Sequence, residues 1–194
     1  MVTDCLQLLF FVLPRVQQSK MQIIFYEDKE FQGRYYECTT DCPNFSSYLS
    51  RCNSIRVVQG GWMIYERTNY KGFQYFIKRG EYPNFHEWMG FNDAVKSCLA
   101  IPQYKGSYRL RLYERNNFGA KMLEAMDDCP SVSDRFGHHD IQSCNVFEGY
   151  WIFYELTNYK GRQYYLRPGE YRRFSDWGAQ NARVGSFRQI TEFS

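Results

Sequence analysis

Much that would point to an enzyme, a metalloprotein or a membrane protein is missing from this 194-residue sequence. The longest apolar run, 8–13, has six residues, whereas a helix needs roughly 20 to span a bilayer. No Cys-x-x-Cys pair, zinc-like spacing, Ser/His/Asp set, phosphate-binding glycine loop or paired carboxylate stands out. The net charge of +3 comes from interspersed charges, without a block of one sign. We therefore expect no catalytic residues, no cofactor, no nucleic-acid partner and no membrane partner.

Cysteine is too sparse for a secreted disulfide framework, because the seven residues are odd in number and spread along the chain. Small secreted domains usually carry an even and tighter set. We interpret the cysteines as reduced thiols of a cytosolic protein. Cys38 and Cys42 are close enough in sequence to oxidise together if exposed, as damage rather than catalysis.

The first twenty residues stand apart from the rest of the chain. Their apolar run makes a poor signal peptide, because Asp4 sits where a basic region should be and no small-x-small cleavage site follows. Met21 opens a segment that is in phase with the repeats described below. We interpret 1–20 as a disordered extension and Met21 as the functional start. A cleaved targeting segment is the alternative.

Aromatic residues are abundant, at 19% of the chain, and they belong to a phrase that occurs four times. In each copy an aromatic residue and a glutamate are followed, six residues after the glutamate, by glycine or, in the third copy, by alanine. Repeats with periods of this length indicate stacked supersecondary units. The copies comprise Tyr26, Glu27 and Gly33; Tyr65, Glu66 and Gly72; Tyr113, Glu114 and Ala120; and Tyr154, Glu155 and Gly161.

The four copies form two similar halves. The second and fourth copies are the closest pair and lie 89 residues apart, and the same offset relates Gly80-Glu81-Tyr82 to Gly169-Glu170-Tyr171. Each half thus holds two unequal copies, which indicates a duplication of a duplication. We expect one domain at 21–101, with motifs 21–59 and 60–101, a linker at 102–106, and a second domain at 107–194, with motifs 107–148 and 149–194.

Short runs of β-forming residues, bounded by turn residues, predict the fold class. Tyr, Phe and Trp favour strands, and no segment shows a long 3.6-residue stripe. Short strands at this spacing predict an all-β protein in which each half is a sandwich of two antiparallel sheets. Small helical turns are expected at 88–90 and 176–178. The tryptophans, two in each half, are expected to be largely buried: Trp62, Trp88, Trp151 and Trp177.

In each phrase the chain must fold back between the glutamate and the glycine. Glycine adopts a positive φ without a Cβ clash, and the aromatic residue can then lie over its bare backbone. The isolated glutamates make no paired acid–base site. In the third copy, alanine at positive φ costs about 1–2 kcal/mol. Either Ala120 carries this strain, or the turn slides so that Gly119 takes the special position.

These features resemble the βγ-crystallins. The Greek-key motif of that family combines the aromatic-Glu-x5-Gly phrase with a serine near the end of each copy, here Ser54, Ser97, Ser143 and Ser186. The flanking sequence is similar to that of vertebrate lens γ-crystallins, nearest the S type. The similar segments are 42–55, 80–85, 88–93, 151–156 and 159–166. The resemblance covers 21 to about 193. The short linker and the lack of long terminal arms favour the γ over the β class.

The resemblance implies a two-domain, four-motif monomer that makes weak contacts with other crystallins. Tyr82 and Tyr171 match the family's tyrosine corners, where the hydroxyl bonds back to the backbone. Tyr165 is more polar than the aliphatic residue usual at its position in the family. The resemblance also implies a hydrophobic contact between domains, made by pairs 89 residues apart: Met63, Phe76 and Ile101 with Ile152, Tyr165 and Ile190.

Some βγ-crystallins bind Ca²⁺ through a loop of the form Asn/Asp-Asn/Asp-x-x-Ser/Thr-Ser, because Ca²⁺ needs several oxygen ligands. The nearest match here is Asn92, Asp93 and Ser97, but Lys96 places an ammonium where a hydroxyl oxygen should be. We therefore expect weak or no calcium binding and no metal site. The adjacent pair His138-His139 is interpreted as part of a surface loop.

The function that the resemblance implies is structural: transparency and a high refractive index at high protein concentration in the cytoplasm of lens fibre cells. Arg, Tyr, Phe, Trp, Met and Cys carry polarisable electrons, and interleaved charges avoid patches of one sign. Two alternatives stay open, a calcium-binding module and a secreted sandwich that binds carbohydrate or membrane, since fold alone does not fix function. An enzyme is not expected.

Overall fold

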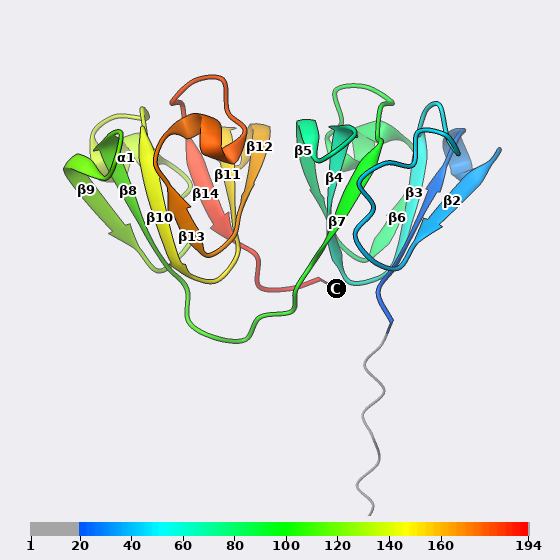
Figure 1. The fold of residues 1–194 in the computed structure, drawn as a ribbon, viewed down its shortest axis with the longest axis horizontal. Coiled ribbons are helices and arrows are strands. Elements are labelled where there is room, and N and C mark those ends of the chain that lie inside the picture. The colour runs from blue at the N-terminus through cyan, green and yellow to red at the C-terminus, as the bar shows by residue number, and fades with distance from the viewer. Residues whose placement is uncertain (1–19, 194) are drawn as a thin grey trace, which may run out of the picture.

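The computed structural model describes residues 20–193, so the interpretation of 1–19 lies outside the described residues. This part of the chain forms fourteen short strands, three 3-10 segments and one short α-helix, arranged as two lobes side by side (Figure 1). The first lobe contains β1 (Gln22–Tyr26), β2 (Tyr35–Cys38), β3 (Ser54–Gln59), β4 (Gly61–Arg67), β5 (Lys71–Ile77), β6 (Gly80–Tyr82) and β7 (Ser97–Ile101). The second contains β8 (Arg109–Arg115), β9 (Gly119–Ala125), β10 (Ser143–Glu148), β11 (Trp151–Leu156), β12 (Lys160–Leu166), β13 (Gly169–Tyr171) and β14 (Ser186–Gln189). The all-β prediction is confirmed.

Each lobe exchanges one strand between its two sheets, as expected for a Greek key. β6 lies beside β3 in the sheet ordered β2-β1-β3-β6, although its residues follow those of β4 and β5 in the second copy of the phrase. In the second lobe β13 lies beside β10 in the same way, in the sheet ordered β13-β10-β8-β9. Both exchanged pairs are antiparallel. The exchange ties the two copies of each lobe into a single sandwich.

The remaining strands of both lobes form one sheet, ordered β14-β11-β12-β5-β4-β7. Its junction is between β12 and β5, which face each other near the centre of Figure 1. The two strands pair through Gln163 and Gln74. The family resemblance implied a hydrophobic contact between the domains, and the structure adds a shared sheet to it.

Each lobe has its own apolar core between its two sheets. The indole N–H groups of Trp62 and Trp151 donate to the carbonyls of Gln59 and Glu148 at 3.1 and 3.0 Å. Full burial of a large aromatic side chain stabilises a fold by roughly 1.5–3 kcal/mol. At most 3% of the surface of any tryptophan is exposed: Trp62, Trp88, Trp151 and Trp177.

The helical turns lie slightly earlier than the sequence indicated. The 3-10 segments cover Phe85–Trp88 and Phe174–Trp177, rather than 88–90 and 176–178. The first begins early because the Asn84 side chain accepts a hydrogen bond from the His86 N–H at 3.0 Å. It ends because Met89 leaves the helical region at φ 60°.

One helix, α1 (Val132–Phe136), was not predicted from the sequence. Ser131 caps its start by accepting from the Asp134 N–H at 3.4 Å, and Gly137 ends it at φ 93°. Val132 and Phe136 lie one turn apart, and both are buried in the core of the second lobe. A serine three residues before an acidic residue and a glycine just after the segment were the available signals.

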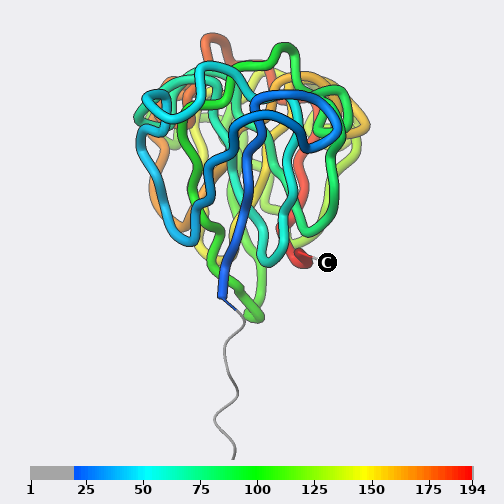
Figure 2. Tube along the Cα trace, turned by 90° about the vertical axis from the view of Figure 1, so that its right-hand side faces the viewer, coloured from blue at the N-terminus to red at the C-terminus, as the bar shows by residue number. Residues whose placement is uncertain are grey.

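Three parts of the chain meet at one end of the molecule. Figures 1 and 2 show the start of β1, the connection between the lobes and the C-terminal segment together at the lower end.

Within residues 20–193 no helix has the length and apolar character needed to cross a membrane.

Candidate functional site: repeated hairpins and a domain interface

The four repeated phrases share one backbone conformation. In each hairpin two consecutive residues adopt φ values between 55° and 61°. Two successive positive φ values are typical of type I′ turns, for which asparagine is well suited at the first position. Asparagine takes that position in three hairpins and Glu30 takes it in the first. The pairs are Glu30-Phe31, Asn69-Tyr70, Asn117-Phe118 and Asn158-Tyr159.

A third positive φ follows two residues later, at the glycine of the phrase. A Cβ at Gly33 would lie 2.6 Å from Asp28 Oδ2, and one at Gly72 would lie 2.6 Å from Glu66 Oε1. At these two glycines acidic side chains occupy the space that a Cβ would fill, whereas at Gly161 the nearest atom is Leu156 Cγ, at 2.9 Å. Glycine at Gly33 and Gly72 fits both the positive φ and this close approach without strain.

The aromatic ring of each phrase packs against the aromatic residue five positions later. The four pairs have ring centroids 5.5–5.8 Å apart in edge-to-face geometry. This arrangement is favoured by the ring quadrupoles. It also covers the turn residues with positive φ. The pairs are Tyr26 with Phe31, Tyr65 with Tyr70, Tyr113 with Phe118, and Tyr154 with Tyr159.

A fully buried serine anchors each hairpin. The Ser186 hydroxyl donates to the Leu156 carbonyl at 2.6 Å and accepts from the Tyr159 N–H at 3.0 Å. Ser54, Ser97 and Ser143 make the equivalent two bonds in their own hairpins. One hydroxyl thus satisfies two backbone groups that strand pairing leaves open. This explains why the serine accompanies every copy of the phrase.

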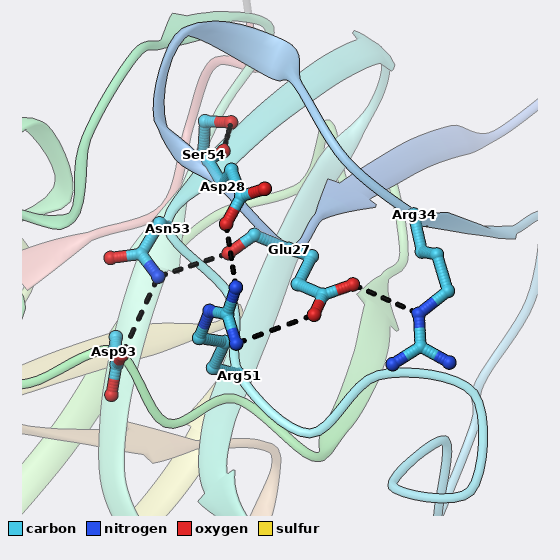
Figure 3. A network of polar contacts seen from close by, with 7 residues as sticks. All are labelled: Glu27, Asp28, Arg34, Arg51, Asn53, Ser54 and Asp93. Atoms are coloured by element: carbon cyan, nitrogen blue, oxygen red, sulfur yellow. Dashed lines mark hydrogen bonds and ion pairs between the residues drawn. The ribbon is translucent and has the colours of Figure 1, made fainter.

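The glutamate of each phrase makes ion pairs or hydrogen bonds within its own hairpin region. Glu27 contacts the Nε of Arg34 at 2.9 Å and a terminal nitrogen of Arg51 at 3.3 Å (Figure 3). The hydrogen bond from Arg34 lowers the pKa of the Glu27 carboxyl. Arg51 also contacts Asp28 Oδ1 at 2.8 Å. These contacts fit a structural role for the carboxylate.

The loop nearest to a calcium motif lies beside this network. Asn92 donates to Glu66 Oε2 at 2.8 Å, and Asp93 Oδ2 accepts from the Asn53 side chain at 3.4 Å (Figure 3). The hydroxyl of Ser97 makes both of its hydrogen bonds within its own hairpin, to the Arg67 carbonyl and from the Tyr70 N–H. The oxygen-bearing side chains of this loop are therefore engaged in internal contacts, and the guanidinium of Arg51 lies between the neighbouring carboxylates of Glu27 and Asp28.

His139 is exposed on the second lobe, whereas His138 is half-buried and its Nε2 atom is covered. His138 Nε2 is 3.9 Å from Glu114 Oε1, and His139 Nε2 is 3.6 Å from Asp140 Oδ1. Each histidine thus has a single acidic neighbour. Within residues 20–193, no group of three or more His, Cys, Asp or Glu side chains is placed to hold a metal ion.

The six described cysteines are free thiols, and five of them are buried. Burial raises the pKa of Cys52 and of Cys144. Cys42 is half-buried, and burial raises its pKa as well. A hydrogen bond from the Cys98 thiol lowers the pKa of Cys38. Cys5 lies outside the described residues.

The six residues expected at the domain interface lie in one apolar cluster between the lobes. Phe76 is half-buried at its margin, and the other five are at most 8% exposed: Met63, Ile101, Ile152, Tyr165 and Ile190. The cluster also contains Tyr65, Tyr154 and Leu99, which the sequence reasoning did not assign. The hydroxyl of Tyr165 is buried without a hydrogen-bond partner among the described residues, and burial raises its pKa.

Two glutamines complete the interface with a reciprocal pair of hydrogen bonds. Gln74 Oε1 accepts from the Tyr165 N–H at 2.8 Å, and Gln163 Oε1 accepts from the Phe76 N–H at 2.9 Å. Gln74 also donates to the Trp177 carbonyl at 3.3 Å. Sequence reasoning missed both glutamines. The available signal was an uncharged polar residue at the same place in two aromatic-rich strands, 89 residues apart.

The two tyrosine-corner positions have matching contacts. The Tyr82 hydroxyl donates to the Lys78 carbonyl at 2.8 Å, and the Tyr171 hydroxyl donates to the Arg167 carbonyl at 3.1 Å. Each bond fixes the turn that leads into an exchanged strand, β6 or β13.

Ala120 adopts φ 62°, whereas Gly119 is not among the residues with positive φ. Of the two alternatives for the third hairpin, the strained alanine is therefore the one that forms. We expect Ala120→Gly to raise the free energy of unfolding by about 0.5–1 kcal/mol, because relief of strain exceeds the added entropy of the unfolded chain.

This prediction can be checked by urea denaturation. Ala100→Gly in β7 is the control, and since Ala100 has no positive φ it should lower stability. A lower unfolding midpoint for Ala120→Gly would contradict the presence of strain at this residue.

Comparison with known proteins agrees with these features. The sequence matches the family model "Crystall: Beta/Gamma crystallin" over residues 22–101 and 109–190. Gamma-crystallin M2 and gamma-crystallin S-1 of Chiloscyllium indicum are each 61% identical over 171 residues, covering 88% of this chain and 97% and 99% of their own. Gamma-crystallin B of Mus musculus is 58% identical over 172 residues, covering 89% of this chain and 98% of its own. Since M2 and S-1 are equally identical, these two relatives do not single out the S type. The chain belongs to the beta/gamma crystallin family and is similar to vertebrate gamma-crystallins over most of its length.

Proposed function

We propose that the protein is a structural constituent of the eye lens that provides transparency and refractive power at high concentration. The observation that carries this proposal is 58–61% identity to vertebrate gamma-crystallins over nearly their whole length. The gamma-crystallins to which this chain is similar are structural proteins, and this chain is not an enzyme.

The structure supports the proposal through the way its polarisable side chains are accommodated. Aromatic residues make up 19% of the chain, and many of their rings pack in pairs. Exposed arginines cover further rings, as Arg188 does over Tyr159 at 3.7 Å and Arg56 over Phe31 at 4.1 Å. Cation–π contacts of this kind hold polarisable groups against the surface without leaving them open to other molecules.

The same features fit a monomer that makes weak contacts with other crystallins. Acidic and basic groups are paired across the surface rather than segregated. Mixed surface charge favours solubility at high concentration. We infer that the protein works in the cytoplasm of lens fibre cells. We also infer that its folded units are 21–101 and 107–194, joined by 102–106.

The experiment is a measurement of the refractive index increment of the purified protein by interferometry. We expect a value above that of a globular protein of average composition and similar size, because Arg, Tyr, Phe and Trp are enriched. Light scattering at high concentration should show a monomer without progressive association. An average increment, or a solution that turns cloudy at moderate concentration, would contradict the proposal.

A further inference from the structure

A cavity of about 320 Å³ is lined by residues of the first lobe, the linker and the C-terminal segment. Figure 1 shows these segments at the lower end of the molecule. Arg79 contributes from the turn after β5, Lys105 and Gln103 from the linker, and Thr191 from the C-terminal segment. Tyr104 and Phe193 supply two aromatic walls. Residues from both lobes and from the linker therefore converge on one space.

The charge of this cavity has one sign. Arg79 and Lys105 line it, no carboxylate lines it, and neither cation makes an ion pair within the described residues. Ten arginines within residues 20–193 do pair with an acidic group. Two cations beside a concave space attract an anion, since like charges raise the local potential there.

The cations are not required by the fold. The residue 89 positions after Arg79 is Pro168, so the second lobe has no cation at that position, although Arg167 precedes it in the same turn. Lys105 belongs to the linker and has no counterpart in the repeat. The positive cavity is therefore particular to this end of the molecule, which favours a binding role over a scaffold role.

The aromatic walls are held in place by their own contacts. Tyr104 packs edge-to-face against Tyr108 and Tyr150 at 5.3 and 5.9 Å, and its hydroxyl donates to the Ser107 carbonyl at 2.7 Å. The Phe193 carbonyl accepts from the Arg79 N–H at 2.8 Å. A wall that is already ordered loses little entropy when a ligand binds.

The Phe193 ring also depends on a close approach to the first lobe. A Cβ at Gly61 would lie 2.3 Å from the Phe193 ring, so this approach needs glycine. The C-terminal segment is thus seated on the first lobe where it lines the cavity.

We propose that this cavity binds a small organic anion that combines a phosphate with a flat ring, in the size class of a mononucleotide. Arginine binds phosphate oxygens through two parallel N–H donors, and lysine adds a point charge. Gln103 and Thr191 supply neutral polar groups, and the faces of Tyr104 and Phe193 receive the ring. The volume lies at the small end of the range for ligand pockets, which suits a mononucleotide.

The test is an NMR titration of the full chain with adenosine monophosphate at low ionic strength, with inorganic phosphate and adenosine as separate probes. We expect shifts at 79, 103–105 and 191–193, and an affinity that falls as salt is added. Arg79→Ala and Lys105→Ala should each weaken binding on the order of tenfold, because each removes one charge contact to the phosphate.

Arg183→Ala is the matched control, since Arg183 is exposed in the second lobe and makes no ion pair within the described residues. It should leave the affinity unchanged. Equal affinity for inorganic phosphate and adenosine monophosphate would overturn the role of the aromatic walls. Shifts elsewhere, or equal losses in the Arg183 variant, would overturn the site itself.

Discussion

Replacing Ser186 with alanine is expected to lower the free energy of unfolding by about 2–4 kcal/mol. The hydroxyl serves two buried backbone groups, the Leu156 carbonyl and the Tyr159 N–H. Alanine leaves both without a partner, and each unsatisfied buried group costs roughly 1–3 kcal/mol. The side chain is fully buried, so water cannot replace it without rearrangement of the hairpin.

The measurement is urea denaturation followed by tryptophan fluorescence. Ser107→Ala is the control, because the Ser107 hydroxyl bonds to an exposed carboxylate, that of Glu148, at 2.7 Å. The control should change stability by less than about 0.5 kcal/mol. A Ser186 variant as stable as the Ser107 variant would show that the hydroxyl is not the anchor of the fourth hairpin.

The second large effect is expected at the interface between the lobes. Ile152 is 1% exposed in the cluster that contains Met63 and Ile190. Ile152→Ala removes buried apolar atoms and leaves a cavity, at a cost of about 2–4 kcal/mol. Since the cluster couples the domains, its loss should also separate their unfolding into two steps.

Differential scanning calorimetry can detect this separation as two resolved transitions. Val58→Ala is the control, because Val58 is 42% exposed in β3 and lies outside the interface cluster. It should preserve the shape of the unfolding curve. A single transition of unchanged cooperativity for Ile152→Ala would mean that the apolar cluster does not couple the two domains.

The repeats explain how much of the fold could be predicted. The Tyr-Glu-x5-Gly motif involves residues that are close in sequence and form one hairpin. The conformation of that hairpin can therefore be predicted from the sequence alone. The anchoring serines could be noticed for the same reason, but their two partners lie about thirty residues earlier and become visible only in three dimensions.

The rest could not be predicted because it depends on individual contacts that the local sequence pattern does not specify. In the third hairpin the positive φ could have fallen on Gly119 instead of Ala120. The position of the Phe85–Trp88 turn depends on one side-chain cap, that of Asn84. The reciprocal bonds of Gln74 and Gln163 join residues that are far apart in sequence. Tertiary contacts of this kind leave no periodic pattern.

The shared sheet has a consequence for what would happen if the two lobes were separated. β5 and β12 would then each present an open edge with unpaired backbone groups, a ready template for pairing with other chains. Tethering places the two edges at an effective concentration in about the millimolar range. Each edge strand therefore pairs with its partner in the same chain before it meets a strand of another molecule. The connecting segment thus acts as protection against polymerisation.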